Sequence, residues 1–377
     1  MKVLESNRLS AGPMMEQFEK RMARLHGCRF GLFCNSGTSA LQIALAAIKE
    51  REGWKDGDEI LVPATTFVAT SNVVIYNGLR PVFVDVEPDY YCIDPQQLER
   101  HITPRTRAIM PVHIGGLPCD MDPIADIAAK HRLHIVEDSC ESMFVHYKGR
   151  PVGSFSTIAA FSTYVAHIIS TGVGGLCITD DPEYQVMLRS MMNHGRDSIY
   201  IRIDDDKNLG SDELFELASR RFSFVRLGHS FRATEMEAAL GLAQLDEQSE
   251  NHARRLHLAS RLTAGLADLQ EYLQLPAVRP GAEHAYMFYP IVVNNKRVSR
   301  DRLIQHLETS AIETRYLLPL INQPIYRQLF GNLDTQYPVA ALLNSNAFYV
   351  GCYPDMTDED VDYMVDRFHN YFAGVSE

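Results

Sequence analysis

The chain has 377 residues, of which 46% are hydrophobic and 22% are charged, a composition typical of a packed globular protein and not of a disordered one. Its 36 Lys and Arg residues stand against 48 Asp and Glu residues, and the net charge of −12 argues against a nucleic acid as the main partner. No apolar run approaches the roughly 20 residues that span a bilayer, and the first residues lack the apolar core of a signal peptide. We therefore expect a cytoplasmic protein that does not enter a membrane.

The seven cysteines are scattered along the chain, and no two of them have the C-x-x-C spacing that zinc and iron–sulfur sites usually need. The sequence therefore predicts no metal site. We expect reduced thiols that are mostly buried as small apolar groups. These residues are Cys28, Cys34, Cys92, Cys119, Cys140, Cys177 and Cys352.

The first part of the chain alternates helical and strand-like patterns. Apolar residues at helical spacing predict helices over residues 14–25 and 38–50. Short apolar runs then predict strands that alternate with further helices, the strands over 59–62, 81–85, 107–112, 133–137, 158–162 and 175–179 and the helices over 66–77, 95–101, 121–131 and 182–192. This alternation indicates parallel βαβ units, so we predict an α/β fold with helices on both faces of one sheet.

The pattern changes in the second half of the chain. Residues 197–230 are polar and irregular, which favours an exposed excursion. Helical patterns follow over 232–247 and 249–268, and a mixed pattern then predicts a smaller α+β domain, with strands over 285–293 and 312–316 and helices over 299–309 and 357–372. The predicted domains are a large one over residues 1–249 and a small C-terminal one over residues 250–377.

The first candidate site is the turn Asn35-Ser-Gly37-Thr38-Ser-Ala-Leu41, which follows the apolar run 30–34 and opens a predicted helix. The unpaired N–H groups and the positive dipole at a helix N-terminus suit a phosphate group. An ordinary Ser or Thr cap is the simpler interpretation of this turn taken alone.

Three further candidates follow predicted strands, where the ligand groups of parallel sheets gather. Asp138 could hold a proton on a heterocyclic nitrogen, although a helix cap is an equal alternative. Phe67 offers an aromatic face for stacking, whereas most such residues belong to the core. Ser162 ends a strand and His167 follows it before a glycine-rich turn, which combines a phosphate ligand with a titratable base.

The order and spacing of these motifs resemble the fold-type-I pyridoxal-phosphate (PLP) enzymes, and within them the DegT/StrS family of nucleotide-sugar aminotransferases. The resemblance runs nearly end to end through the segments RLSAGP, NSGTSAL, GDEILVPATTFVAT, PVFVDVEPDYYCIDP, MPVHIGGLPCDMDPI, IVEDS, YKGRPVGSFSTIAAFS, TGVGG, NHGR, EMEAALGLAQL, IETRYLLPL and NQPIYRQL. It implies a large cofactor-binding domain, whose mostly parallel sheet is sandwiched by helices, and a smaller C-terminal α+β domain.

The resemblance also implies roles for the candidate residues. The amides of Gly37 and Thr38, helped by Ser162, would hold the cofactor phosphate. Phe67 would stack on the pyridine ring, and Asp138 would pair with the pyridinium nitrogen and so preserve the ring as an electron sink.

One position departs from the aminotransferase pattern F-S-x-x-x-x-K, in which the lysine tethers the cofactor and moves the proton. His167 stands at that position, and Lys148, in a loop segment of the family, is a poor replacement. An imidazole cannot form the tether but can take up a proton near neutrality. The same Lys-to-His change marks the branch of the sugar 3-dehydratases, such as GDP-4-keto-6-deoxymannose 3-dehydratase, which the sequence resembles. That branch implies noncovalent pyridoxamine phosphate (PMP), a C4-keto sugar, and His167 as the base for loss of the C3 hydroxyl.

Other positions bear on this branch. Glu141 stands where the aminotransferases commonly carry Gln, and the segments 284–290 and 349–354 resemble two strands of the dehydratases. Val173 replaces a usual Glu, and Ser230 replaces an Asn that would reach the cofactor phosphate of the neighbouring subunit, so these two point away from the branch. By the resemblance we count Glu141 and Ser230 among the cofactor-binding residues and expect a homodimer.

The sequence thus favours C3 dehydration of a nucleotide-linked 4-keto-6-deoxy sugar, with an amino donor such as glutamate to renew the amine. Arg232 and Arg315 are candidates for phosphate or carboxylate contacts, since a guanidinium suits both, and surface ion pairing is the competing role. A nucleotide-sugar aminotransferase is the first alternative, and a non-catalytic paralogue that binds the cofactor is the second. The presence of Asp138, Ser162 and the turn at Gly37 argues against the second alternative.

Overall fold

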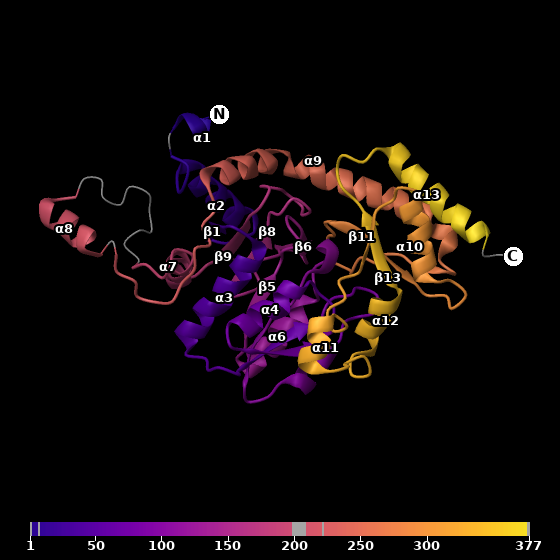
Figure 1. Cartoon of the computed structure of the whole chain (residues 1–377), viewed down its shortest axis with the longest axis horizontal. Coiled ribbons are helices and arrows are strands. Elements are labelled where there is room, and N and C mark those ends of the chain that lie inside the picture. Colours follow the sequence, from indigo (N-terminus) through magenta and orange to yellow (C-terminus); the bar gives the residue numbers. More distant parts are fainter. Residues whose placement is uncertain (1, 7, 198–208, 221, 375–377) are drawn as a thin grey trace.

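The computed structural model describes residues 2–6, 8–197, 209–220 and 222–374. The largest sheet within these ranges is built from β1 (Phe30–Cys34), β2 (Glu59–Pro63), β3 (Arg80–Val84), β4 (Thr106–Ile109), β5 (His134–Asp138), β8 (Ile158–Ser162) and β9 (Gly175–Thr179). The strands lie side by side in the order β1-β9-β8-β5-β4-β2-β3 (Figure 1). Strand β9 is antiparallel to β1 and β8, and the other neighbours are parallel, so the predicted mostly parallel sheet is confirmed.

Helices cover both faces of this sheet, as the sequence predicts. Successive residues of a strand point to opposite faces, and in β2 the side chains of Ile60 and Val62 pack in one core cluster while Leu61 packs in another. The first face carries α3 (Gly37–Glu52), α4 (Val68–Tyr76) and α7 (Pro182–Met191), and the second carries α2 (Pro13–Leu25), α6 (Met121–His131) and the first half of α9 (Glu235–Gly265). The helix expected over 95–101 is a short helix, α5 (Pro95–Leu98), followed by a 3₁₀ turn.

The C-terminal part forms a second, smaller α+β unit. Its antiparallel sheet has the order β10-β11-β13-β12 and is formed by β10 (Leu273–Gln274), β11 (Phe288–Val293), β12 (Thr314–Tyr316) and β13 (Ala347–Gly351). This sheet shares a core with α10 (Arg300–Thr309), α13 (Asp358–Ala373) and the second half of α9. The remaining elements are α1 (Lys2–Glu5), β6 (His146–Tyr147), β7 (Arg150–Pro151), α11 (Pro324–Phe330) and α12 (Pro338–Asn346).

The expectation of two helices over 232–247 and 249–268 is wrong, because both belong to the single 31-residue helix α9. Thr234 caps its start in a capping box with Glu237, and no Gly or Pro interrupts the residues around 248. Helix α9 runs along the molecule, from α2 at one end to α13 at the other (Figure 1). The predicted domain boundary after residue 249 falls inside it and stays a prediction. No helix in the described part of the chain, α9 included, is both long and apolar enough to cross a bilayer.

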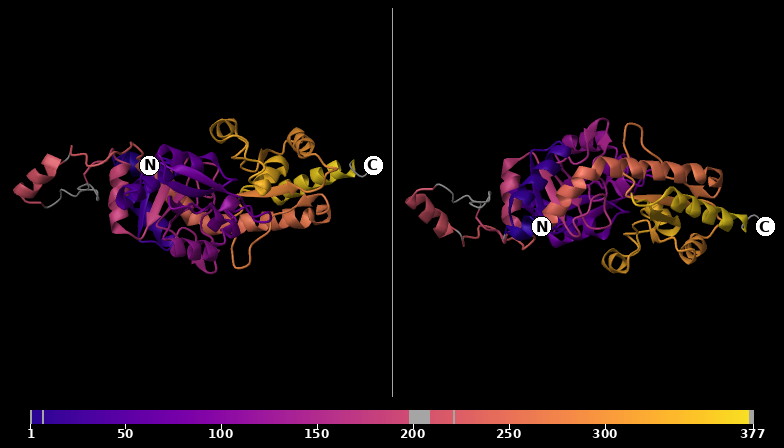
Figure 2. Two further views of the ribbon diagram at one scale, coloured as in Figure 1. Left: turned by 90° about the horizontal axis from the view of Figure 1, so that it is seen from below. Right: turned by 90° about the horizontal axis from the view of Figure 1, so that it is seen from above.

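Within the excursion expected over 197–230, residues 209–220 project away from the rest of the molecule (Figure 2). Its described part is not wholly irregular, because it contains the helix α8 (Ser211–Arg220), whereas residues 198–208 and 221 lie outside the described residues. We call residues 209–220 and 222–227 the arm. The arm exposes large apolar side chains, among them Phe215, Phe222 and Leu227.

Candidate active site

The carboxyl-terminal edge of the large sheet gathers four predicted site residues. Strands β1, β2, β5 and β8 run in the same direction, so their ends meet at one edge. Gly37 follows β1 in the first turn of α3, and Phe67 follows β2 as the residue before α4. Asp138 and Ser162 are the last residues of β5 and β8.

The turn before α3 forms a narrow cradle. The hydroxyl of Ser36 accepts the N–H of the third helical residue at 3.0 Å, and the N–H groups of Gly37 and Thr38 have no acceptor within the helix. A Cβ atom on Gly37 would lie 2.7 Å from Cβ of Ser162 and 2.8 Å from Sγ of Cys140. The cradle therefore admits no side chain at Gly37 and leaves backbone N–H groups open to a small anion.

The carboxyl group of Asp138 is buried between α4 and the start of the next loop. Its Oδ2 atom accepts the hydroxyl of Thr70 at 2.8 Å, and its Oδ1 atom accepts the N–H of Cys140 at 3.2 Å. Burial raises the pKa of Asp138, and these two hydrogen bonds oppose the shift. No Lys or Arg of the described residues forms an ion pair with it, so a cation supplied by a ligand would be its first charged partner.

Thr70 is a site residue that the sequence analysis missed. Because Thr70 gives its single hydrogen to Asp138, its oxygen accepts the hydroxyl of Thr66, 2.9 Å away. The two threonines therefore form a chain of hydrogen bonds that orients the Asp138 carboxylate. The signal in the sequence is the pair of hydroxyl residues four positions apart in PATTFVAT, at the start of a helix.

Phe67 and Glu141 differ in their surroundings. The ring of Phe67 is 56% exposed, which makes its face available for stacking and contradicts the core alternative. The carboxyl group of Glu141 is buried and accepts the N–H of Gly115 at 2.7 Å. Burial, with the nearby charge of Asp138, raises the pKa of Glu141 to about 8. At neutral pH the group therefore favours its protonated form, which presents an O–H.

His167 lies in the loop after β8 that returns to β9. The loop is closed by backbone hydrogen bonds between Thr163 and both Gly174 and Thr171. Within it the N–H of His167 donates to the carbonyl of Tyr164 at 2.9 Å, and the Nδ1 atom of the imidazole is buried without a hydrogen-bond partner. Burial lowers the pKa of His167 to about 4, so the ring is neutral at physiological pH. A neutral imidazole is able to accept a proton.

Ser230 and Arg232 lie beside the turn that forms the cradle, because the carbonyl of Phe231 accepts the N–H of Asn35 at 2.8 Å. Arg232 donates hydrogen bonds to Oγ of Ser230 and to Oδ1 of Asn193, both at 3.2 Å. Both predicted residues are exposed. The expected reach of Ser230 to a neighbouring subunit stays a prediction.

The contacts of Arg315 match its competing role. This residue lies on β12, is exposed, and forms an ion pair with Glu313. Lys148 is also exposed and pairs with Asp122. Neither side chain has a described contact with the edge that carries Asp138.

These features fit a phosphorylated pyridine cofactor. The cradle at Gly37 suits a phosphate, the buried carboxylate of Asp138 suits a protonated ring nitrogen, and the exposed ring of Phe67 suits the ring face. The orphaned Nδ1 atom of His167 is a buried polar atom that still needs a partner.

Comparisons with known proteins agree with this fit. A model of the DegT/DnrJ/EryC1/StrS aminotransferase family matches residues 1–369. The spore coat polysaccharide biosynthesis protein SpsC of Bacillus subtilis (strain 168) is 32% identical over 98% of this chain and 92% of its own length. The GDP-perosamine synthase of Caulobacter vibrioides is 32% identical over 94% of this chain and 89% of its own length.

The same relationship holds in three dimensions. The E. coli GDP-4-keto-6-deoxy-D-mannose-3-dehydratase, solved with bound hydrated PLP, has a TM-score of 0.87 and 26% identity, covering 97% of this chain and 94% of its own. The family and its structural neighbours depend on PLP or PMP and include aminotransferases and dehydratases of deoxysugar biosynthesis. With matches along almost its whole length, the chain belongs to the DegT/DnrJ/EryC1/StrS aminotransferase family and has the PLP fold type I.

Proposed function

We propose that the chain is a PMP-dependent 3-dehydratase of a nucleotide-linked 4-keto-6-deoxy sugar, with His167 as the base. One observation carries this proposal: His167 stands where the family resemblance implies a tethering lysine, and its imidazole is neutral and has a buried, unpartnered Nδ1 atom. Such a group can take up a proton but cannot hold the cofactor covalently.

The other site residues have binding and orienting roles in this proposal. The N–H groups of Gly37 and Thr38, with Ser162, hold the phosphate. Asp138 keeps a proton on the ring nitrogen, and Phe67 covers the face of the ring. When bound, PMP supplies an amine for the sugar ketone and a ring that draws electrons from the adjacent carbon.

His167 then moves the proton that the elimination requires. With PMP bound, His167 would accept the proton that the elimination releases, and the C3 hydroxyl of the sugar would leave with a proton as water. The low pKa of His167 leaves the imidazole unprotonated at neutral pH, and the unprotonated ring is the form that can accept a proton. Glutamate is the proposed donor that renews the amine, and a homodimer is the proposed assembly.

A nucleotide-sugar aminotransferase is the second candidate. The 32% identity with a GDP-perosamine synthase favours it. It needs an amine transfer without a lysine tether, through PMP that binds and leaves. A non-catalytic paralogue that binds the cofactor is the remaining alternative, and it would bind PMP without forming either product.

The first test asks whether a covalent link to the cofactor exists. The purified protein is mixed with PLP, treated with borohydride and weighed by mass spectrometry, with His167→Lys as the matched control. We expect no adduct on the unaltered protein and an adduct on the variant. An adduct on the unaltered protein would remove the basis for His167 as the base.

The second test identifies the product. With PMP, glutamate and a panel of NDP-4-keto-6-deoxy sugars, the dehydratase yields a 3-deoxy sugar and ammonia, whereas an aminosugar would establish the second candidate. In His167→Asn we expect the 3-deoxy sugar to disappear and PMP binding, measured by calorimetry, to change little. Deoxysugar formation at an undiminished rate by this variant would show that another residue takes the proton.

A further inference from the structure

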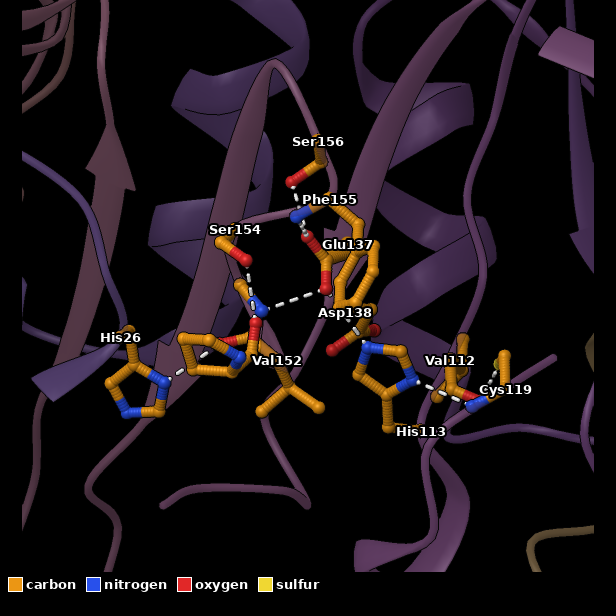
Figure 3. A network of polar contacts seen from close by, with 12 residues as sticks. His26, Val112, His113, Cys119, Glu137, Asp138, Val152, Ser154, Phe155 and Ser156 are labelled. Atoms are coloured by element: carbon orange, nitrogen blue, oxygen red, sulfur yellow. Dashed lines mark hydrogen bonds and ion pairs between the residues drawn. The ribbon is translucent and has the colours of Figure 1, made fainter. Parts of the chain in front are cut away.

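A buried imidazole, that of His113, lies next to the proposed cofactor site and has no role in the reaction described above. Figure 3 shows its ring between Glu137 and Cys119, close to Asp138. Its Nδ1 atom accepts the N–H of Cys119 at 3.0 Å, and its Nε2 atom lies 3.1 Å from Oε1 of Glu137. A backbone amide can only donate, so Nδ1 carries no hydrogen and the neutral ring has its hydrogen on Nε2. His113 therefore donates to Glu137.

The carboxylate of Glu137 is fully occupied by donors (Figure 3). Besides His113, it accepts the N–H of Gly153 at 2.7 Å, the N–H of Phe155 at 2.9 Å and the hydroxyl of Ser156 at 2.7 Å. Burial alone would raise the pKa of Glu137, but these hydrogen bonds outweigh burial and lower it. Glu137 is thus an ionised group with no oxygen left for a substrate.

His113 is also linked to Asp138 through the backbone. Its N–H donates to the carbonyl of Asp138 at 3.2 Å, and the N–H of Asp138 donates to the carbonyl of Pro111 at 3.0 Å. The segment 111–113 therefore continues the parallel pairing beyond the end of β4 and clamps the peptide groups of Asp138. Anchoring the His113 ring between Cys119 and Glu137 fixes this segment.

The two neighbouring carboxylates lie on different sides of the sheet. Glu137 and Asp138 are consecutive residues of β5, so their side chains point to opposite faces. His113 therefore acts on Asp138 through the backbone: its ring is held by Glu137 while its own N–H fixes the carbonyl of Asp138. An Asp138 that is free to shift would make a poorer hydrogen bond to a cationic ring nitrogen and would hold it more weakly.

We infer that His113 is a positioning residue of this site: through its anchor on Glu137 and the segment 111–113, it keeps the carboxylate of Asp138 aimed at the nitrogen of a bound pyridine ring. The inference rests on the proposed function, because it needs a cofactor with a basic ring nitrogen. His113 itself touches neither cofactor nor substrate in this arrangement.

The experiment compares two probes that differ only at the ring nitrogen. The dissociation constants of PMP and of 1-deaza-PMP, in which a C–H replaces the nitrogen, are measured by calorimetry. We expect the unaltered protein to prefer PMP by about tenfold or more, the size of one charge-assisted hydrogen bond. In His113→Phe the preference should fall close to one. His113→Asn keeps an acceptor for Cys119 but is too short to reach Glu137, so its preference for PMP should also fall close to one. This variant replaces His113→Phe in the test if the Phe variant does not fold.

The matched control is His26→Phe. His26 is equally buried and donates to the carbonyl of Val152 at 2.8 Å, but it forms no hydrogen bond with Asp138 (Figure 3). Its loss should lower the melting temperature and leave the preference for PMP unchanged. If the His113 variants lose stability yet keep the preference, His113 is only structural and the inference is overturned.

The outcomes also separate this inference from the proposed function. Tight binding of PMP with no preference over 1-deaza-PMP by the unaltered protein would overturn the role of Asp138 and His113 but not that of His167. Failure of the unaltered protein to bind PMP at all would overturn the proposed function and this inference together.

Discussion

Glu141 is a carboxyl group in surroundings that disfavour its charge. It is buried, the N–H of Gly115 is its donor, and Asp138 lies nearby. Its pKa is about 8 in the folded protein, against an ordinary value of 4.5. Between these two values the unfolded chain ionises Glu141 while the folded protein does not, so rising pH favours unfolding over this window. Below about 4.5 Glu141 has no such effect, and above about 8 its destabilising effect is complete.

Glu141→Gln should therefore change the pH dependence of stability. The variant lacks the ionisation, so its free energy of unfolding relative to the unaltered protein should rise from pH 5 to pH 8 by at most about 1.4 kcal/mol per pH unit. Urea unfolding at pH 5, 6.5 and 8 measures this difference. Glu271→Gln is the control, because it makes the same substitution at an exposed position. A difference that stays constant over this range would mean that Glu141 is already ionised in the folded protein.

The sequence identifies the residues that end strands better than the residues that support them. Gly37, Asp138 and Ser162 are predicted because polar or small residues lie at the ends of apolar runs. Phe67 is predicted because it is an aromatic residue in the segment that follows such a run. The structure places all four at one edge. The supporting partners are distant along the chain, since Thr70 is 68 positions from Asp138 and the partner of His113 is 24 positions away. Only the pairing order of the strands brings such residues together.

At the scale of elements, two glycines bring the cradle turn against its neighbours. Gly37 lies against Ser162 and Cys140, and a Cβ atom on Gly175, at the start of β9, would collide with the backbone of Ser36 and Gly37. Gly175 is thus explained by the close approach of two backbones, whereas Gly172 has open space around it and a positive φ.

Gly37→Ala should weaken phosphate binding. The added methyl group would press on Ser162 and Cys140 and shift the first turn of α3, so we expect the affinity for PMP to fall at least about tenfold and that for pyridoxamine, which lacks the phosphate, to fall less. Calorimetry with both compounds measures this. Gly210→Ala, whose Cβ has room in the arm, is the control. Equal losses for both compounds would contradict a phosphate role for the cradle.

The predicted elements of the large sheet are confirmed within a few residues. In this part of the chain the hydrophobic periodicity and the turn-forming residues between elements indicate the same boundaries. The sequence analysis missed α8, α11 and α12, which are short, and divided α9 where polar residues interrupt its apolar stripe. Packing against α2 at one end and α13 at the other keeps α9 continuous, and this tertiary support cannot be seen in a local pattern.

At the scale of the whole molecule, the arm is the feature that most needs a partner. It projects from the body, and Phe215, Phe222 and Leu227 are more than three-quarters exposed (Figure 2). Removing apolar surface of this kind from water contributes a favourable free energy of about 25 cal/mol per Å². The proposed homodimer provides a second copy that could cover it.

Phe215→Ser combined with Leu227→Ser should weaken this dimer. Light scattering coupled to gel filtration at micromolar concentrations should show a dimer for the unaltered protein and a shift towards monomer for the double variant. Leu329→Ser, at an exposed apolar position on α11, should leave the dimer intact. A double variant that stays dimeric would exclude the arm from the interface.

The uninterrupted course of α9 limits how this enzyme can open and close. With 31 residues and a rise of about 1.5 Å each, it is a rigid rod about 46 Å long that is embedded in both parts of the molecule. A hinge between those parts would have to break several turns of its backbone hydrogen bonds. A bulky substrate therefore has to enter while the two ends of this rod keep their distance from each other.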